Sequence, residues 1–340
     1  MARTFNVAVV GATGAVGETM LAILAQREFP VGKVHAVASA RSAGSRVAFG
    51  DGYLTVQDLD TFDFSDVDIG LFSPGASVSK IHAPRAAAAG CVVIDNTSQF
   101  RYDDDIPLIV PEVNPDALVA YRNRNIIANP NCSTIQMVVA LKPIYDAVGI
   151  ERINVCTYQA VSGTGKEAIE ELAGQTAALL NGKGVEPTVY PKQIAFNCLP
   201  HIDVFQDNGY TKEEMKMVWE TRKIMGDESI RVNPTAVRVP VFYGHSEAVH
   251  IETARKISAA EVTELLRQAP GIAVLDERAD GGYPTAVTDA ANADPVFVGR
   301  IREDISHPRG IDLWVVSDNV RKGAALNSVQ IAEMLVKSHL

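Results

Sequence analysis

Cysteine is scarce in this sequence, and its four positions are scattered along the chain. Cys91, Cys132, Cys156 and Cys198 have neither the number nor the spacing of a disulfide framework or a zinc site. Cysteines that form neither disulfides nor zinc sites are typical of proteins in a reducing compartment. We therefore expect a cytoplasmic protein that holds no metal.

Positive charge and long apolar runs are scarce as well. The formal net charge is −10, with acidic residues spread along the chain, which argues against a nucleic-acid-binding face. No apolar run approaches the roughly 20 residues of a membrane-spanning helix. The first residues lead directly into a predicted strand, without the layout of a signal peptide. We expect neither a nucleic-acid nor a membrane partner.

A dinucleotide-binding turn is the first feature that the sequence does contain. An apolar strand over residues 5–10 is followed by Gly-Ala-Thr-Gly-Ala-Val-Gly at 11–17, and then by a helical pattern. In such a turn Gly11 permits the sharp bend, Gly14 lets a pyrophosphate approach, and Gly17 lets helix and strand pack closely. The alternative is a tight turn that binds no ligand.

The end of the second predicted strand, 34–38, bears on the choice of nicotinamide cofactor. NAD would favour an acidic residue there for the ribose 2′-hydroxyl, but the chain continues Ser39-Ala40-Arg41-Ser42. A guanidinium between two serines suits a 2′-phosphate, which favours NADP. The alternative is that Arg41 is an ordinary solvated loop residue.

Strands and helices alternate through the first 130 residues. Further strands are predicted at 67–72, 91–95, 108–110 and 126–128, with a helix at about 77–89. Such alternation predicts an α/β fold with a Rossmann-type parallel sheet, in which ligands gather at the carboxyl ends of the strands. We assign residues 1–130 to an NADP-binding domain, completed by a C-terminal helix at about 320–340.

A different pattern begins at about residue 151, as a chain of 340 residues leads one to expect. Long strands are predicted at 152–161, on both sides of 243–246, at 296–301 and at 311–317. Long strands with few helices indicate an α+β domain with a mixed sheet. We therefore expect residues 131–319 to form a catalytic and dimerisation domain.

Cys132 stands at the start of a predicted helix, in Asn129-Pro130-Asn131-Cys132-Ser133-Thr134. Backbone N–H groups at a helix start have no intrahelical partners and favour the thiolate over the thiol. Because this segment follows a strand of the first domain, we expect the cysteine to face the cofactor cleft.

Three polar residues at predicted strand ends complete a candidate catalytic set. Gln159 precedes Ser162-Gly163, Arg238 interrupts an apolar strand, and His245 follows Gly244. A thiol, a histidine, an amide and a cation are the parts of acyl transfer coupled to a nucleotide.

These segments resemble the aspartate-semialdehyde dehydrogenase family. The matching motifs are Gly11–Gly17, Asn129–Thr134, Tyr158–Gly163, Arg238–Val241, Gly244–Ser246 and Asp318–Ala324. They occur in the family's order over essentially the whole chain, so together they are specific.

The resemblance implies a reversible reaction in which NADPH reduces L-aspartyl 4-phosphate to L-aspartate 4-semialdehyde and phosphate is released. It implies a thioester on Cys132, acid and base catalysis by His245, and an orienting role for Gln159. It also implies a homodimer and a place in the biosynthesis of lysine, threonine, methionine and diaminopimelate.

The resemblance also implies ligand contacts. Those for the substrate are Arg101 and Asn131 with phosphate, Arg238 with the α-carboxylate, and Glu213 and Lys216 with the amine and phosphate. Those expected for the cofactor are Gly11, Thr13, Gly14, Ala15, Val16, Gly17, Ser39, Arg41, Ser42, Ser73, Gly75, Ser162, Gly163 and Asn319.

Some of these residues have ordinary structural explanations. Arg238 alone fits half of a buried salt bridge, and His245 alone fits a hydrogen-bonded turn. Glu213 and Lys216 fit a solvated helix pair. The remaining cysteines and His201 and His250 are interpreted as structural or incidental. A capping-box pattern at Thr211 and Glu214 would explain the start of that helix without any ligand.

Two other functions are compatible with the sequence. N-acetyl-glutamyl-phosphate reductase shares the fold plan and the cysteine chemistry, on a longer and acylated substrate. A non-catalytic dinucleotide-sensing protein would keep the nucleotide fold and would be indifferent to the loss of the Cys132 thiol.

Overall fold

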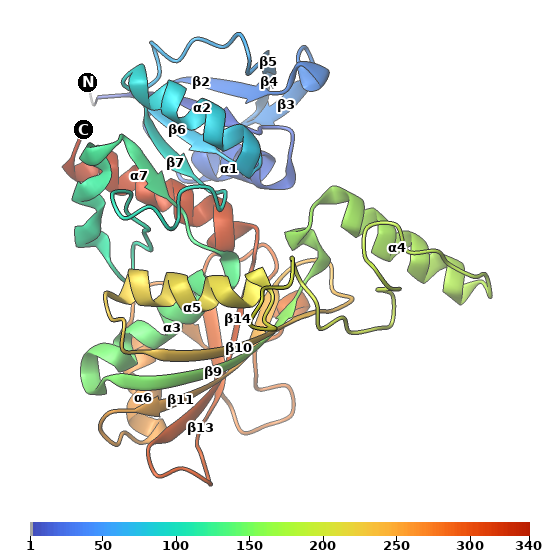
Figure 1. The fold of residues 1–340 in the computed structure, drawn as a ribbon, viewed down its shortest axis with the longest axis vertical. Helices are drawn as coiled ribbons and strands as arrows, with labels where there is room; N and C mark the ends of the chain where they lie inside the picture. The colour runs from blue at the N-terminus through green and yellow to red at the C-terminus, as the bar shows by residue number, and fades with distance from the viewer. Residues whose placement is uncertain (1–2) are drawn as a thin grey trace. The chain divides into compact units, whose positions relative to one another are not determined.

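The structure is a computed structural model that describes residues 3–340. The chain divides into two compact units, Met1–Pro130 with Ala324–Leu340, and Asn131–Gly323. We call them the N-terminal unit and the C-terminal unit, and Figure 1 shows the elements of each. The last segment of the sequence therefore belongs to the unit formed by the first 130 residues.

A six-stranded parallel sheet forms the centre of the N-terminal unit. Its strand order is β5-β2-β1-β6-β7-β8, with every neighbouring pair parallel. The strands are β1 Phe5–Val10, β2 Val31–Ala38, β5 Gln57–Asp58, β6 Ile69–Phe72, β7 Val92–Asp95 and β8 Ile126–Ala128. The chain moves from β1 first to one side and then, with β6, to the other. The switch point between β1 and β6 is where such sheets bind ligands.

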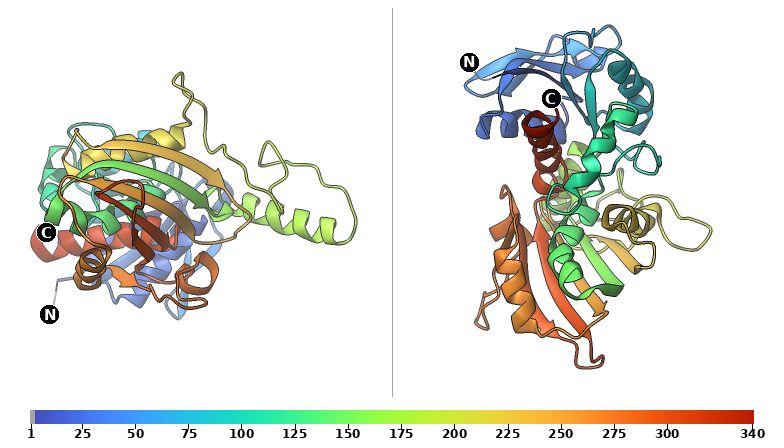
Figure 2. Two further views of the ribbon diagram at one scale, coloured as in Figure 1. Left: turned by 90° about the horizontal axis from the view of Figure 1, so that it is seen from below. Right: turned by 90° about the vertical axis from the view of Figure 1, so that its left-hand side faces the viewer.

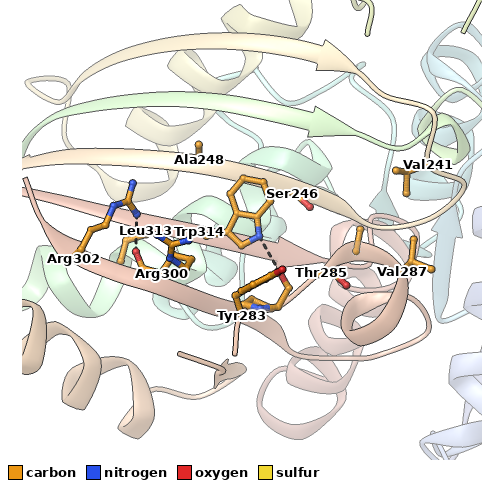
Figure 3. A pocket seen from close by; sticks show the side chains of 12 residues that line it. Val241, Ser246, Ala248, Tyr283, Thr285, Val287, Arg300, Arg302, Leu313 and Trp314 are labelled. Atoms are coloured by element: carbon orange, nitrogen blue, oxygen red, sulfur yellow. Dashed lines mark hydrogen bonds between the residues drawn. The ribbon is translucent and has the colours of Figure 1, made fainter. Parts of the chain in front are cut away.

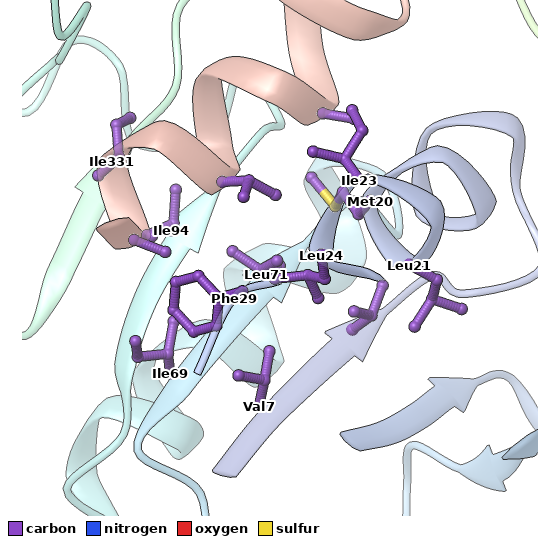
Figure 4. Packing of buried hydrophobic residues seen from close by; sticks show 14 of the residues in the cluster. Val7, Met20, Leu21, Ile23, Leu24, Phe29, Ile69, Leu71, Ile94 and Ile331 are labelled. Carbon is purple, nitrogen blue, oxygen red and sulfur yellow. The ribbon is translucent and has the colours of Figure 1, made fainter. Parts of the chain in front are cut away.

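Helices and a small hairpin complete this unit. They are α1 Ala15–Gln26, α2 Ala76–Ala88, α7 Leu326–Ser338, the 3-10 segments Ala40–Ser42 and Pro115–Asn123, and the antiparallel strands β3 Arg46–Phe49 and β4 Gly52–Thr55. Figure 4 shows Met20 and Leu24 of α1, four residues apart and so on one helix face, among the side chains of the sheet. Ile331 of α7 belongs to the same buried cluster, which explains why the C-terminal helix returns to this unit.

The C-terminal unit is built on a mixed sheet, as the sequence predicts. The order is β10-β9-β11-β14-β13-β12, in which β10 with β9 and β12 with β13 are parallel and the other pairs antiparallel. The strands are β9 Ile150–Gln159, β10 Arg231–Arg238, β11 His245–Thr253, β12 Ile272–Val274, β13 Val296–Glu303 and β14 Gly310–Ser317.

Four helices accompany the mixed sheet. They are α3 Cys132–Val148, α4 Lys166–Leu180, α5 Lys212–Met225 and α6 Ala259–Gln268, with short helical segments at Val161–Gly163 and Ala286–Ala290. A further short segment, Arg321–Ala325, includes the residues where the chain passes from this unit to the N-terminal unit. Helices α3, α5 and α6 contact strands of the sheet, whereas α4 extends away from it, as Figures 1 and 2 show. Within residues 3–340, every helix is too short or too polar to cross a bilayer.

Two expectations from the sequence are wrong in detail. Residues 108–110 are not a strand; Leu108 makes a single bridge to Ala128. The reason is local, because the Asn114 side chain accepts from the Val110 N–H and donates to the Leu108 carbonyl. The strands on both sides of 243–246 are present, but the second begins at His245, within the segment that the sequence assigns to the connection.

Candidate active site

A cavity of about 490 Å³ lies beside the glycine turn of the N-terminal unit. It is where the carboxyl ends of β1, β2 and β6 meet. Of the residues expected to contact the cofactor, those that line it are Gly11, Thr13, Gly14, Ser39, Arg41, Ser42 and Ser73. Ala15, Val16 and Gly17 lie in the first turn of α1, and Gly75 is the residue before α2.

Steric constraints explain two glycines of the turn. Gly11 has φ +87°, and a Cβ there would lie 2.6 Å from the Ser73 carbonyl oxygen. A Cβ at Gly17 would overlap the Gly11 carbonyl oxygen. Glycine at both positions lets strand, turn and helix approach closely, as the sequence pattern predicts.

An acidic side chain that the sequence pattern does not reveal also lines this cavity. Asp60 follows the short strand β5, and its carboxylate is 3.5 Å from Nε2 of His82, another lining residue. The usual pattern of an NAD site places an acidic residue at the end of the second strand, and this chain has none at that position. A strand of two residues has no periodicity, so the sequence gives no signal for Asp60.

Cys132 is the first residue of α3, as the sequence predicts. The Asn131 side chain caps this helix by accepting from the Ser133 N–H at 3.1 Å. A Cβ at Gly323 would lie 2.7 Å from the Cβ of Cys132, so glycine lets the backbone pass directly against the cysteine. The thiol therefore has a fixed place at the mouth of a capped helix.

His245, the first residue of β11, is fully buried. Its Nδ1 accepts a hydrogen bond from the Ala160 N–H at 3.0 Å, which leaves the proton of the neutral ring on Nε2. Nε2 has no hydrogen-bond partner among the described residues. Burial, and then the positive charge of Arg238, lower the pKa of His245 to about 3. The ring is thus neutral and offers an unused N–H donor.

Arg238, the last residue of β10, lies beside this histidine. It is buried, its Nη1 donates to the Ala160 carbonyl at 2.7 Å, and its Nε has no partner within the described residues. A Cβ at Gly163 would lie 3.1 Å from Nη1 of Arg238 and 3.5 Å from Nε2 of His245. Gly163, which we expected among the cofactor contacts, therefore lies against the candidate catalytic groups.

Ser162 and Asn319 form a link between loops of the C-terminal unit. Their side chains are hydrogen-bonded to each other at 3.0 Å, and Asn319 Oδ1 accepts from the Gly244 N–H at 2.9 Å. The loop that precedes His245 is thereby tied to the segments after β9 and β14. Their expected contact with the cofactor stays a prediction.

Glu213 is the centre of a buried polar network. Its Oε1 accepts from the side-chain amides of Asn131 at 3.0 Å and Gln159 at 3.2 Å, and its Oε2 accepts from Lys216 Nζ at 2.8 Å. Burial alone would raise the pKa of Glu213. The charge and hydrogen bond of Lys216, the Asn131 bond and Arg238 outweigh burial and bring the pKa to about 2.

The interpretation of Glu213 and Lys216 as a solvated helix pair is wrong. Their side chains are only 7% and 12% exposed, and Lys216 also donates to Asp203 at 2.9 Å. Burial alone would lower the pKa of Lys216, but the Glu213 charge outweighs it and raises the pKa. The capping box of Thr211 and Glu214 is confirmed, with both reciprocal hydrogen bonds present.

Arg101 belongs to the N-terminal unit, in the loop after β7. It is buried, and its guanidinium donates to the carbonyl oxygens of Asn96 at 3.0 Å and Thr97 at 3.1 Å. These bonds hold the side chain in one orientation. Its expected contact with phosphate stays a prediction.

The other cysteines differ from Cys132 in their surroundings. Cys91 is buried, and burial raises the pKa of its thiol. Cys156 is half-buried within β9, Cys198 is exposed, and none of the four cysteines forms a disulfide within the described residues. Across residues 3–340, no three His, Cys, Asp or Glu side chains are grouped to hold a metal ion.

Two further acidic residues near the site are absent from the sequence prediction. Glu220 on α5 accepts from the Asn131 N–H at 2.6 Å. Glu247 on β11 is fully buried, and burial raises its pKa well above the usual value. Glu220 lies seven positions after Glu213, so helical spacing could have indicated it, but nothing in the sequence marks Glu247.

The fold and the site define a class of protein. The N-terminal unit has the switch point and glycine turn of a dinucleotide-binding sheet. The C-terminal unit brings a helix-start cysteine, a neutral histidine with a free N–H, and an arginine to the ends of its elements. A dinucleotide-binding enzyme that acts through a thiol has these parts.

Comparisons with known proteins identify the family. Residues 6–121 match the family described as semialdehyde dehydrogenase, NAD binding domain, and residues 141–322 match semialdehyde dehydrogenase, dimerisation domain. The chain is 65% identical over 339 residues to the aspartate-semialdehyde dehydrogenase of Shewanella violacea, with 100% of both chains covered.

Solved structures agree with this match. The crystal structure of aspartate semialdehyde dehydrogenase II from Vibrio cholerae, complexed with ASA, has a TM-score of 0.98 and 63% identity over 100% of both chains. The enzyme of Candida albicans, solved with NADP, has a TM-score of 0.75 and 27% identity over 98% of both chains.

The chain therefore belongs to the aspartate-semialdehyde dehydrogenase family. It is an oxidoreductase of amino-acid biosynthesis with aspartate-semialdehyde dehydrogenase activity, an NAD(P)-binding domain and a dimerisation domain. The resemblance recognised in the sequence motifs is confirmed.

Proposed function

We propose that this chain reduces L-aspartyl 4-phosphate to L-aspartate 4-semialdehyde, reversibly and with NADPH, through a thioester on Cys132. The observation that carries the proposal is the position of Cys132, at the start of α3 and directly after Asn131. Asn131 is itself bonded to Glu213, which also holds Gln159. The place of this reaction would be the biosynthesis of lysine, threonine, methionine and diaminopimelate.

In the first step the Cys132 thiolate attacks the carbonyl carbon of the acyl phosphate. The carbon–sulfur bond forms, the carbon–oxygen bond to phosphate breaks, and phosphate leaves with that electron pair. Sulfur suits both halves of the reaction because a thiolate is a strong nucleophile and a good leaving group. A thioester also accepts a hydride more readily than an oxygen ester, since sulfur donates little electron density into the carbonyl.

In the second step His245 stabilises the negative oxygen that forms on the former carbonyl. The reduced nicotinamide, when bound, supplies a hydride to the thioester carbon. His245 keeps its proton on Nε2 and donates a hydrogen bond from there, which is electrostatic stabilisation of an oxyanion. The carbon–sulfur bond then breaks, the aldehyde leaves, and Cys132 is again a thiolate. The sequence analysis expects His245 to act as both acid and base. The geometry supports the part of this role in which His245 is a hydrogen-bond donor.

The substrate contacts proposed for this reaction follow the charges of the site. Arg238, buried with its Nε unused by the protein, would hold the α-carboxylate. The ionised Glu213 suits the substrate ammonium, and Lys216 suits a phosphate oxygen. Asn131 and Arg101 are proposed as further phosphate contacts. Gln159 would orient the acyl group.

NADP is the proposed cofactor, held by residues 1–130 with the helix at 320–340, while residues 131–319 carry catalysis. The cavity beside the glycine turn fits a dinucleotide because Gly11 and Gly14 expose their backbone to it. Its lining also contains Ser39, Arg41 and Ser42, which are donors for a 2′-phosphate. The relative from Candida albicans was solved with NADP.

Replacing Arg41 with alanine tests the choice of cofactor. We expect the KM for NADP to rise about 10- to 100-fold, because hydrogen bonds to the phosphate charge are lost, while the KM for NAD changes little. Initial rates with each cofactor measure this. The matched control is Arg46→Ala, since Arg46 lies over the Tyr53 ring outside this cavity. An unchanged preference for NADP in Arg41→Ala would place the phosphate contact elsewhere.

A homodimer formed through the C-terminal unit is the proposed assembly. A pocket of about 490 Å³ lies on this unit (Figure 3). Of its lining residues, Tyr283 is 43% and Val287 68% exposed, and the Trp314 indole N–H donates to the Pro284 carbonyl. Exposed apolar side chains around a pocket are typical of a protein interface.

Light scattering on the purified protein tests this assembly and should give twice the mass of the chain. A monomer mass at micromolar concentration would contradict the dimer. A cytoplasmic location stays a prediction.

An assay of two aldehydes tests the proposed reaction. With NADP and phosphate, L-aspartate 4-semialdehyde should be oxidised, and the absorbance of the NADPH formed should increase. Without phosphate, no increase in NADPH absorbance is expected. N-acetyl-glutamate 5-semialdehyde is the matched alternative substrate. Turnover confined to the acetylated aldehyde would instead identify an N-acetyl-glutamyl-phosphate reductase. Cofactor binding without turnover of either aldehyde would identify a dinucleotide sensor.

A further inference from the structure

Helix α5 directs two buried carboxylates at one residue. Glu213 and Glu220 are 5% and 0% exposed and lie seven positions apart, which places both on the same face of the helix. Glu213 accepts from the Asn131 side chain at 3.0 Å, and Glu220 accepts from the Asn131 backbone N–H at 2.6 Å. One helix therefore holds Asn131 by its main chain and by its side chain.

The hydrogen bonds of Asn131 leave it little freedom. Its N–H and its side-chain amide bind α5, and its side-chain oxygen accepts from the Ser133 N–H at the start of α3. Consecutive Cα atoms are about 3.8 Å apart, so a displacement of Asn131 must displace Cys132. The position of the thiol is thus coupled to α5 through the residue before it.

Two acidic residues of α5, Glu214 and Glu220, have different hydrogen-bond partners and different roles. Glu214 closes the capping box of its own helix and accepts from the Ala236 N–H at 3.0 Å, which is a structural duty. Glu220 instead bonds the segment that carries the nucleophile. A carboxylate buried in the protein loses its hydration, and this loss must be offset by the bonds that it accepts.

We propose that Glu220 is a positioning residue, which sets the place of the Cys132 sulfur by accepting the Asn131 N–H. The inference deepens the proposed function and rests on Cys132 as its nucleophile. Glu213 is shared among Asn131, Gln159 and Lys216 and, in the proposed function, is drawn to the substrate ammonium. The bond from Glu220 holds Asn131 and Cys132 in position while Glu213 exchanges a protein partner for the substrate ammonium.

Two substitutions distinguish the effect of the side-chain length of residue 220 from the effect of its negative charge. Glu220→Asp keeps the carboxylate but is one methylene too short for the Asn131 N–H, so kcat should fall about 100-fold, the scale of a misplacement near 1 Å. Glu220→Gln keeps the reach and an oxygen acceptor, so its kcat should stay close to that of the wild type. The KM for NADP should not change in either variant, because the cofactor cavity belongs to the other unit.

Glu214→Asp is the matched control, with the same shortening on the same helix. It should lower the thermal unfolding midpoint by weakening the capping box while kcat stays near the wild-type value. Full kcat in Glu220→Asp, or a loss in Glu220→Gln as large as in Glu220→Asp, would overturn the proposal. Cys132→Ala measured alongside separates the two failures: an active Cys132→Ala enzyme removes the proposed function, and an inactive one with a fully active Glu220→Asp removes this inference alone.

Discussion

Replacing Cys132 with alanine should lower kcat at least about 10⁴-fold, the scale seen when a nucleophile is removed from an enzyme that acts through a covalent intermediate. The side chain is half-buried at the start of α3 and leaves room for alanine, so the fold should be kept. Formation of NADPH from the semialdehyde and phosphate measures the rate. Cys198→Ala is the control, because Cys198 likewise forms no disulfide but is exposed and lies outside the hydrogen-bonded network.

The same variant distinguishes a covalent route from direct hydride transfer. Under turnover the wild-type protein should carry an acyl adduct on the peptide containing Cys132, and Cys132→Ala should carry none. Mass spectrometry of the quenched protein detects the adduct. A Cys132→Ala enzyme that retained more than a small fraction of the wild-type rate would rule out the thioester.

Replacing His245 with asparagine should lower kcat about 10³-fold, within the range for a lost oxyanion donor or proton-transfer group. Asparagine is shorter, so its amide cannot keep the Ala160 bond and also present a donor at the position of Nε2. The KM for the semialdehyde should change less than kcat, since the lost interaction acts on the transition state.

His250→Asn is the matched control for this change. His250 lies on the same strand, β11, but is bonded to Asp312 at 3.1 Å rather than to the site. Its kcat should stay near the wild-type value. Equal losses in the two variants would show that the effect comes from the strand rather than from the Nε2–H of His245.

The pH dependence should show the neutral state of His245. Its pKa of about 3 is lowered from 6.5 first by burial and then by Arg238, so the ring is uncharged above pH 3 and its protonation does not change between pH 5 and 8. The plot of kcat/KM against pH, which reports the free enzyme, should therefore lack a step near 6.5 from this residue. A wild-type step near 6.5 that disappears in His245→Asn would contradict this assignment.

Local features of the fold could be predicted because their causes lie within a few residues. The turn at Gly11–Gly17 depends on Gly11, which has positive φ, and on Gly17, where a Cβ would overlap the backbone. The start of α3 follows from the capping residue Asn131 and the apolar run after it. The capping box at Thr211 and Glu214 is likewise a contact between near neighbours, and all three are found where the pattern places them.

Contacts between distant segments could not be predicted in the same way. Gly163 is a loop residue in the sequence, and only the pairing of β9 with both β10 and β11 brings it against Arg238 and His245. Glu213 and Lys216 have the spacing of a solvated pair, and only the packing of α5 buries them. The strand expected at 108–110 fails because a side chain six residues from Leu108, Asn114, takes its backbone partners.

The amino-acid sequence by itself determined the glycine turn, the cysteine at the mouth of a capped helix and the alternation that makes the first sheet parallel. Each of these depends on backbone conformations and spacings within one segment. Tertiary structure alone decided the neutral tautomer of His245 and the clamp of Glu213 and Glu220 on Asn131. Those properties depend on burial and on hydrogen bonds between segments more than 80 residues apart, which local sequence patterns do not encode.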